Sequence, residues 1–204
     1  MTRAATLAGL FDDLADSYDH DHHERIADAL LARARPGAYD AVADVACGAG
    51  AVALRLARAR PDSAPPVLAV DISPRMIEAG RGRAVGGVVD WRVADAVPLP
   101  VPDGSLDAVF CASSLHFLGC RALADWRRVL RPGGQVAYSL PLAGHFRPSS
   151  RFAALLAADV PLPAGPEDAV DWAVGHGFTD VTAQVAVFGD RRVAVTAARL
   201  PEHP

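Results

Sequence analysis

The first stretch suited to ligand chemistry joins one aspartate to a turn with two glycines. Asp44 precedes the turn Cys47-Gly48-Ala49-Gly50. Glycines let a ligand approach the backbone closely, and a helix that begins after such a turn offers free N–H groups. The turn alone is compatible with a dinucleotide, a mononucleotide or tight helix–strand packing. Asp44 favours a ligand with positive charge, such as an ammonium or sulfonium group, because a carboxylate repels a pyrophosphate.

Two further aspartates follow apolar runs of the chain. Asp71 lies 21 residues beyond Gly50, where a carboxylate can accept hydrogen bonds from both hydroxyls of a ribose. It could instead cap the following helix, but its place at a strand end favours the ribose interpretation. Asp95, followed by Ala96, could accept a hydrogen bond from an adenine amino group. Taken alone, Asp95 is better explained as an ordinary loop residue.

Histidines are the candidates for proton transfer, since the chain has no lysine. His116 lies in the segment SSLHF at 113–117 and could be a base, a substrate hydrogen-bonding group or a packed residue. His145 is the second candidate. The run HDHH at 20–23 suggests a metal, but no second cluster completes a ligand shell, so we expect no metal site.

The hydrophobic pattern predicts the elements that must position these residues. Helical spacing covers the first 35 residues and stops at Pro36-Gly37. Strands are expected at 41–46, 67–70, 88–93, 106–112 and 135–140, and helices at 51–60, from Ser73-Pro74, at 121–130, near 149–159 and at 166–175. Alternating apolar residues from 181 onward, interrupted by Gly189-Asp190, predict a closing hairpin.

Strands that alternate with helices indicate a parallel sheet with helices on both faces. We therefore expect an α/β fold: a Rossmann-like, doubly wound sheet of about seven strands, the last antiparallel, with a small helical lid. One domain would span 1–204, with an N-terminal helical lid at 1–37, a cofactor-binding core at 38–140, a short substrate-side segment at 141–177 and a C-terminal hairpin at 178–199. Ligands of such sheets bind beyond the carboxyl ends of the strands.

The composition excludes several classes of site. All 20 basic residues among the 204 are arginine, and asparagine is also absent. The chain therefore has no Walker A, Schiff-base or protein-kinase lysine, no N-glycosylation acceptor and no Cys-His-Asn triad. A GC-rich genome is the plainest explanation of this bias. Any proton transfer would depend on histidine, tyrosine or a carboxylate.

Charge and cysteine content suggest the setting of the protein. A formal net charge of −4 argues against a nucleic-acid partner. The three cysteines form no CxxC pair, which is typical of reduced thiols in a cytoplasmic protein. We recognise no signal peptide and no apolar stretch of about 18 residues, so we expect no membrane partner. The protein would act on a small molecule as a monomer or homodimer.

Four blocks of sequence occur in an informative order. They are VADVACGAG at 42–50, VLAVDISPRMIEAGR at 67–81, VADAVPLPVPDGSLDAVFCASSLHFL at 93–118 and WRRVLRPGGQVAYS at 126–139. In these blocks the chain resembles the class I S-adenosylmethionine-dependent methyltransferases. The closest resemblance is to the small-molecule group related to the ubiquinone/menaquinone-biosynthesis enzymes, methyltransferase type 11. It extends over residues 8–199.

The resemblance implies a site for S-adenosylmethionine, with S-adenosylhomocysteine as the product. Matching positions imply that the methionine end lies against Asp44, Gly48 and Gly50, and that Asp71 accepts from the ribose hydroxyls. The adenine would pack against Ile72 and Met76, with Asp95 and Ala96 at its amino edge. Ser113 would contact the cofactor after the fourth strand, and Tyr18 of the lid segment FDDLADSYD would close over it. Ala46, also a cofactor position, stands where the family usually has glycine. Its methyl group narrows the space on the sulfonium side.

The implied reaction is direct in-line displacement, which moves a methyl group to an O, N, C or S atom of the acceptor. An acceptor that must lose a proton would need a base, His116 or His145. One alternative is a protein of this fold that binds S-adenosylmethionine without methyl transfer, such as a cyclase or regulator, because little chain remains for a substrate lid. An NAD-dependent dehydrogenase is a further alternative, and Asp44 argues against it.

Overall fold

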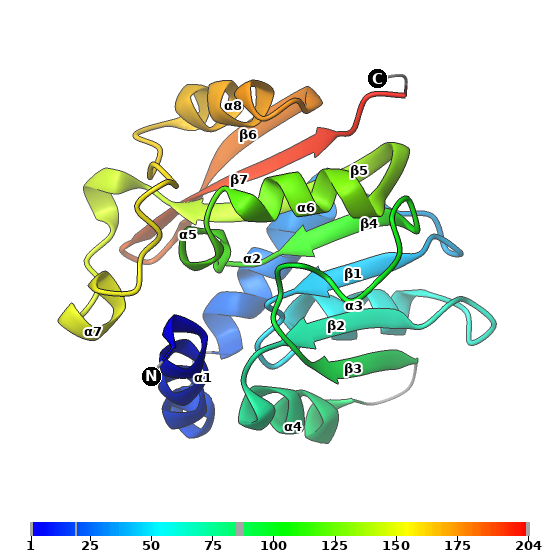
Figure 1. Cartoon of the computed structure of the whole chain (residues 1–204), viewed down its shortest axis with the longest axis horizontal. Coiled ribbons are helices and arrows are strands. Elements are labelled where there is room, and N and C mark those ends of the chain that lie inside the picture. The colour runs from blue at the N-terminus through cyan, green and yellow to red at the C-terminus, as the bar shows by residue number, and fades with distance from the viewer. Residues whose placement is uncertain (1, 19, 85–87, 203–204) are drawn as a thin grey trace.

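The computed structural model describes residues 2–18, 20–84 and 88–202. Within them lies one sheet of seven strands, in the order β3-β2-β1-β4-β5-β7-β6 (Figure 1). The strands are β1 (Val42–Val45), β2 (Val67–Asp71), β3 (Val89–Val93), β4 (Leu106–Cys111), β5 (Leu130–Pro141), β6 (Thr179–Phe188) and β7 (Arg191–Arg199). The first five run parallel, and β7 runs antiparallel between β5 and β6. The expected fold class is therefore confirmed.

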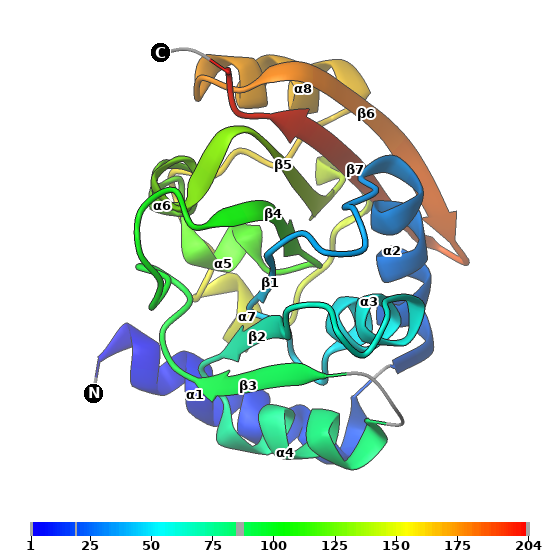
Figure 2. The same cartoon turned by 90° about the vertical axis from the view of Figure 1, so that its right-hand side faces the viewer.

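Helices cover both faces of this sheet. They are α1 (Arg3–Leu14), α2 (His20–Arg33), α3 (Ala51–Ala59), α4 (Pro74–Arg83), α5 (Leu115–Leu118), α6 (Arg121–Val129), α7 (Ser150–Ala153) and α8 (Pro166–Gly175), with short 3-10 turns η1 (Ala15–Ser17) and η2 (Ala143–His145). In Figure 2, α2 and α3 lie on one face, and α5, α6 and α8 on the other. None of the helices in the described residues is long and apolar enough to cross a bilayer.

Strand order marks the place where a ligand can bind, at the carboxyl ends of the parallel strands. β1 is hydrogen-bonded to β2 on one side and to β4 on the other. The chain leaves β1 and β4 toward opposite faces, so the two connections separate beyond the carboxyl ends of these strands. The arrowheads of the parallel strands point to the side where α1, α5 and α7 lie (Figure 1).

Local sequence sets the start of the helices next to this edge. The Oγ atom of Ser73 accepts a hydrogen bond from the Met76 N–H at 3.1 Å, and Pro74 occupies the first helical position, as predicted. α3 begins directly after Gly50, whose φ of 75° is left-handed. Glycine adopts this conformation without the steric cost that a side chain would bring.

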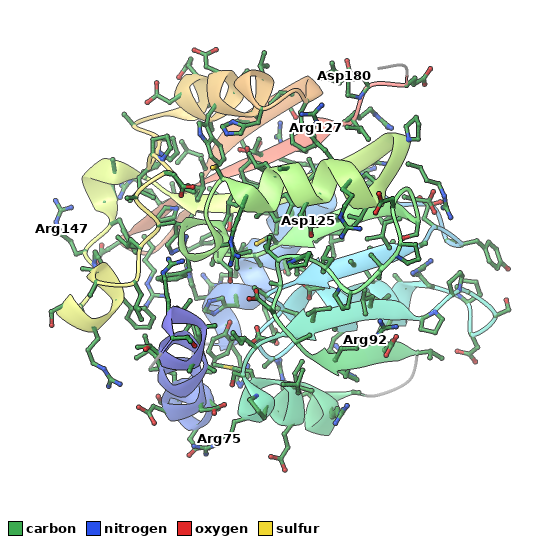
Figure 3. The ribbon with its side chains drawn as sticks, in the orientation of Figure 1. Arg75, Arg92, Asp125, Arg127, Arg147 and Asp180 are labelled. Carbon is green, nitrogen blue, oxygen red and sulfur yellow. The ribbon has the colours of Figure 1, made fainter. Side chains whose placement is uncertain are left out.

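The N-terminal residues form a separate layer across this edge. α1 lies beside α4 (Figures 1 and 2), and Arg75 of α4 forms an ion pair with Asp16 of η1 at 2.7 Å. Figure 3 shows Arg75 below these two helices, at the surface. By contrast, Ile26 and Leu30 of α2 are fully buried against the sheet. Asp19, the last residue of FDDLADSYD, lies outside the described residues.

Some predicted boundaries differ from the structure. The single helical stretch expected over the first 35 residues is divided into α1, η1 and α2. Helix 149–159 is reduced to the four residues of α7, and the fifth strand begins at Leu130 instead of 135. α5 was not predicted. Short helices depend on the packing of their neighbours more than on their own sequence, so periodicity does not define them.

A glycine at the start of α3 provides a test of how closely this edge is packed. A Cβ atom on Gly50 would lie 2.3 Å from the Trp91 ring. We expect Gly50→Ala to lower the free energy of unfolding by about 2–4 kcal/mol, because it adds both overlap and left-handed strain. Chemical denaturation measures this. Gly82→Ala in α4, where nothing lies within 4 Å, is the control and should not destabilise. Equal effects of the two substitutions would contradict the packing argument.

Candidate functional site

A cavity of about 90 Å³ lies at the carboxyl edge of the sheet, beneath α1. Its wall comes from the N-terminal layer, from the turns after β1, β2 and β3, and from α5. The lining residues are Arg3, Ala4, Leu7, Phe11, Tyr18, Ala46, Gly48, Asp71, Ile72, Asp95, Ala96, Ser114, Phe117 and Leu118. Seven of the predicted site residues are among them: Tyr18, Ala46, Gly48, Asp71, Ile72, Asp95 and Ala96.

The turn after β1 has a left-handed backbone. Ala46, Gly48 and Gly50 have φ values of 51°, 52° and 75°. The value at Ala46 explains why glycine is favoured there, since an L side chain in this region is strained. Gly50 does not line the cavity but packs against Trp91. It therefore shapes the turn from behind.

Asp44, at the carboxyl end of β1, is only 1% exposed. Its Oδ2 atom accepts a hydrogen bond from the Ala53 N–H at 2.9 Å, whereas its Oδ1 atom has no partner among the described residues. Burial raises the pKa of Asp44 to about 8. A buried carboxylate oxygen without a donor is costly, and a cationic group placed next to it would remove that cost.

Asp71, at the end of β2, connects two of the turns. Its Oδ2 atom accepts from the Gly48 N–H at 2.7 Å, and its Oδ1 atom accepts from the Ser73 N–H at 2.9 Å. Burial raises the pKa of this carboxyl as well. Each carboxylate oxygen can accept two hydrogen bonds, so Asp71 retains acceptor capacity toward the cavity.

Tyr18 closes the cavity above the β1 turn. A Cβ atom on Gly48 would lie 2.8 Å from the Tyr18 hydroxyl oxygen, so only a glycine admits the tyrosine at this position. The Tyr18 ring stacks on His23 with centroids 4.3 Å apart. Burial raises the pKa of Tyr18, so its hydroxyl is protonated at neutral pH.

The turns after β2 and β3 form the adjoining wall. Ile72 and Ala96 contribute apolar surface to it, while Met76, in the first turn of α4, is fully buried and does not line the cavity. The Oδ1 atom of Asp95 accepts from the Val97 N–H at 3.0 Å, which holds the carboxylate at the rim.

The residues after β4 are divided between the cavity and the core. Ser114 and Phe117 line the cavity. Ser113, with a φ of 61°, donates its backbone N–H to the Ser139 Oγ atom at 2.9 Å and is outside the lining set.

Neither predicted histidine lines the cavity. His116 is buried behind Phe117, with ring centroids 4.2 Å apart, and its Nδ1 atom has no hydrogen-bond partner among the described residues. Burial lowers the pKa of His116 to about 4, so the ring is neutral at pH 7. His145 is exposed in η2. No group of three or more potential metal ligands occurs in the part of the chain that the structure describes.

Several lining residues were not predicted as site residues, and they come mainly from α1 and α5. Phe11 and Phe117 are in edge-to-face contact at 5.9 Å, and Arg3 donates a hydrogen bond to the Phe117 carbonyl at 2.9 Å. No local signal marks Arg3, because the spacing of residues in α1 does not reveal that the helix crosses the sheet edge. Phe117 lies next to His116 in the segment SSLHF after the fourth strand, and that position is the signal that could have identified it.

Comparison with known proteins identifies the core of this fold. Residues 42–134 match the family described as "Methyltransferase domain". The 27-O-demethylrifamycin SV methyltransferase of Amycolatopsis mediterranei is 38% identical over 119 residues, which cover 55% of this chain and 43% of that protein. The ubiquinone/menaquinone biosynthesis C-methyltransferase of Dinoroseobacter shibae is 33% identical over 147 residues, covering 66% of this chain and 58% of that protein. The chain thus spans about half the length of these curated relatives.

A solved structure extends the likeness to nearly the whole chain. The SAM-dependent methyltransferase of Thermotoga maritima superposes with a TM-score of 0.70 at 18% identity, covering 94% of this chain and 98% of that one. At this identity the likeness establishes the fold, whereas the sequence match over 42–134 identifies the domain. The match over residues 42–134, together with this fold, identifies a class I S-adenosylmethionine-dependent methyltransferase domain in the chain.

Proposed function

We propose that this chain transfers a methyl group from S-adenosylmethionine to a small-molecule acceptor. The observation that carries the proposal is the pair of buried carboxylates, Asp44 and Asp71, on either side of the left-handed turn in a domain of this family. When bound, S-adenosylmethionine supplies a methyl group attached to a positively charged sulfur.

The residues around the β1 turn fit such a molecule. The Oδ1 atom of Asp44, buried and without a donor, suits the cationic methionine end. Gly48 lines the cavity and, having no side chain, lets the Tyr18 hydroxyl approach the β1 turn from above. Asp71 has acceptor capacity for the ribose hydroxyls.

The remaining cofactor positions follow from their place on the wall. Ile72 and Ala96 provide apolar surface for the adenine, and Asp95 at the rim accepts from its amino group. Three of the predicted residues act without lining the cavity. Met76 packs in the core as part of α4, Gly50 shapes the β1 turn, and Ser113 is held by Ser139 in the turn after β4.

The N-terminal layer is the lid of this site. Ligand sites usually enclose about 300–1,000 Å³, whereas this cavity encloses about 90 Å³, so α1 and Tyr18 must move outward to admit a nucleoside. Asp12 accepts from the Ser73 hydroxyl at 2.5 Å, and Asp16 pairs with Arg75. The Arg75–Asp16 pair is exposed and screened by water, so it opposes opening only weakly. We assign the lid to residues 2–18, because α2 packs in the core.

Binding experiments separate the proposed function from its alternatives. Calorimetry should detect S-adenosylmethionine and S-adenosylhomocysteine but not NAD. Asp71→Ala should weaken both by about 10–100-fold, since hydrogen bonds to a charged group contribute about 1.5–3 kcal/mol each. Asp90→Ala on the outer strand β3 is the control and should bind normally. Tight NAD binding without a response to S-adenosylmethionine would overturn the proposal, and binding without any transferred methyl group would favour the non-transferring alternative.

The raised pKa of Asp44 predicts a pH dependence of cofactor binding. Below about pH 8 the buried carboxyl of the ligand-free protein is largely protonated, so a cationic ligand must displace that proton. We expect the Kd for S-adenosylhomocysteine to fall as pH rises toward 8 and then to level off, with proton release visible by calorimetry in two buffers. Asp44→Asn should weaken binding and remove the part of the pH dependence that comes from the Asp44 carboxyl. The part that comes from the ligand's own amino group should remain. An identical pH profile in both proteins would contradict the role of Asp44.

A further inference from the structure

The two parts of the cavity wall differ in charge. The turns after β2 and β3 contribute the carboxylates of Asp71 and Asp95. The part formed by α1 and α5 consists of apolar side chains, Ser114 and a single arginine, Arg3. This second part adjoins the β1 turn, since the Ser114 hydroxyl donates to the Ala46 carbonyl at 3.3 Å, and it lies opposite the acidic turns in the same cavity.

Arg3 is held in place by the protein but lacks an ionic partner. Its Nη2 atom donates to the carbonyl oxygens of Phe117 at 2.9 Å and Leu155 at 2.7 Å. No carboxylate of the described residues lies within ion-pair distance of it. Asp159 accepts its hydrogen bonds from the Cys120 N–H and thiol, and these bonds, together with the positive charge of Arg3, lower the pKa of its carboxyl. A guanidinium has five N–H groups, so those of Nε and Nη1 remain for a ligand.

The surroundings of Arg3 favour an anionic partner over a neutral one. Arg3 is itself exposed, and Phe11 and Phe117 supply apolar surface beside it in the same cavity wall. The planar guanidinium matches a carboxylate through two parallel hydrogen bonds. In addition, none of the histidines in the described residues lines the cavity, and an acceptor that is already ionised at neutral pH requires no base.

We propose that Arg3 binds the carboxylate of the methyl acceptor, so that the acceptor is a small organic acid whose apolar part lies against Phe11 and Phe117. This inference rests on the proposed function, because it assumes that a second molecule binds beside the cofactor. It makes Arg3 a specificity-determining residue of the acceptor site.

The test compares acids with their neutral amides. Phenylacetate, benzoate and octanoate, each paired with its amide, are titrated by calorimetry into protein saturated with S-adenosylhomocysteine, so that no turnover is needed. We expect at least one acid to bind about 10-fold or more tightly than its amide, since a charged hydrogen-bond partner is lost in the amide. Arg3→Gln should remove this preference, and Arg3→Lys should retain part of it because the charge remains.

Arg147→Gln is the matched control. Arg147 is also an exposed arginine that donates to a backbone carbonyl, that of Phe146, but it does not line the cavity and points outward in Figure 3. It should leave the acid preference unchanged. The thermal midpoint and the S-adenosylhomocysteine affinity of each variant show whether the substitution disturbs the fold. If Arg3 only holds the fold, Arg3→Gln should weaken the binding of the acid and of its amide equally.

The outcomes distinguish this inference from the proposed function. Equal binding of acids and amides, an acid preference that survives Arg3→Gln, or failure of every probe to bind to protein that does bind S-adenosylhomocysteine would overturn the role of Arg3 alone. Failure of S-adenosylhomocysteine itself to bind would overturn the proposed function and this inference with it.

Discussion

Burial of two carboxylates at the ends of neighbouring strands is the constraint on which the site depends. Asp44 and Asp71 are removed from water by the sheet core, where a carboxylate without partners is costly. Backbone N–H groups therefore converge on them: Ala53 donates to Asp44, and Gly48 and Ser73 donate to Asp71. These bonds hold the β1 turn and the starts of α3 and α4 in a single arrangement. One oxygen of Asp44 remains without a donor and favours a cation.

Stability is distributed unequally around this arrangement. The carboxylates are backed by fully buried residues of the sheet and of α2 and α3. The N-terminal layer is held by two buried leucines, Leu7 and Leu10, and by exposed ion pairs such as Arg75 with Asp16 and Arg151 with Asp13. Exposed ion pairs contribute little, so this layer has fewer strong contacts than the turns beneath it. If the layer opens as proposed, the turns beneath it would keep their geometry while a ligand enters and leaves.

Much of this protein could be predicted from periodicity and turn chemistry. Parallel strands are buried on both faces and appear as continuous apolar runs, which is why β1, β2 and β4 were located within one or two residues. Ser73-Pro74 marked the start of α4, because capping is a local interaction. Asp71, Asp95 and Gly48 follow strands and line the cavity, since the ends of parallel strands meet at one edge.

The sequence by itself determined the fold class, the strand ends and the acidic residues beside them, because these depend on short-range patterns. Only the tertiary structure decided which of those residues reach the cavity. It buried His116, turned Gly50 toward Trp91 and brought Arg3 to the cavity. Gly50 and Trp91 are 41 positions apart, and Arg3 is 114 positions from Phe117, whose carbonyl it contacts, so no local pattern records these placements.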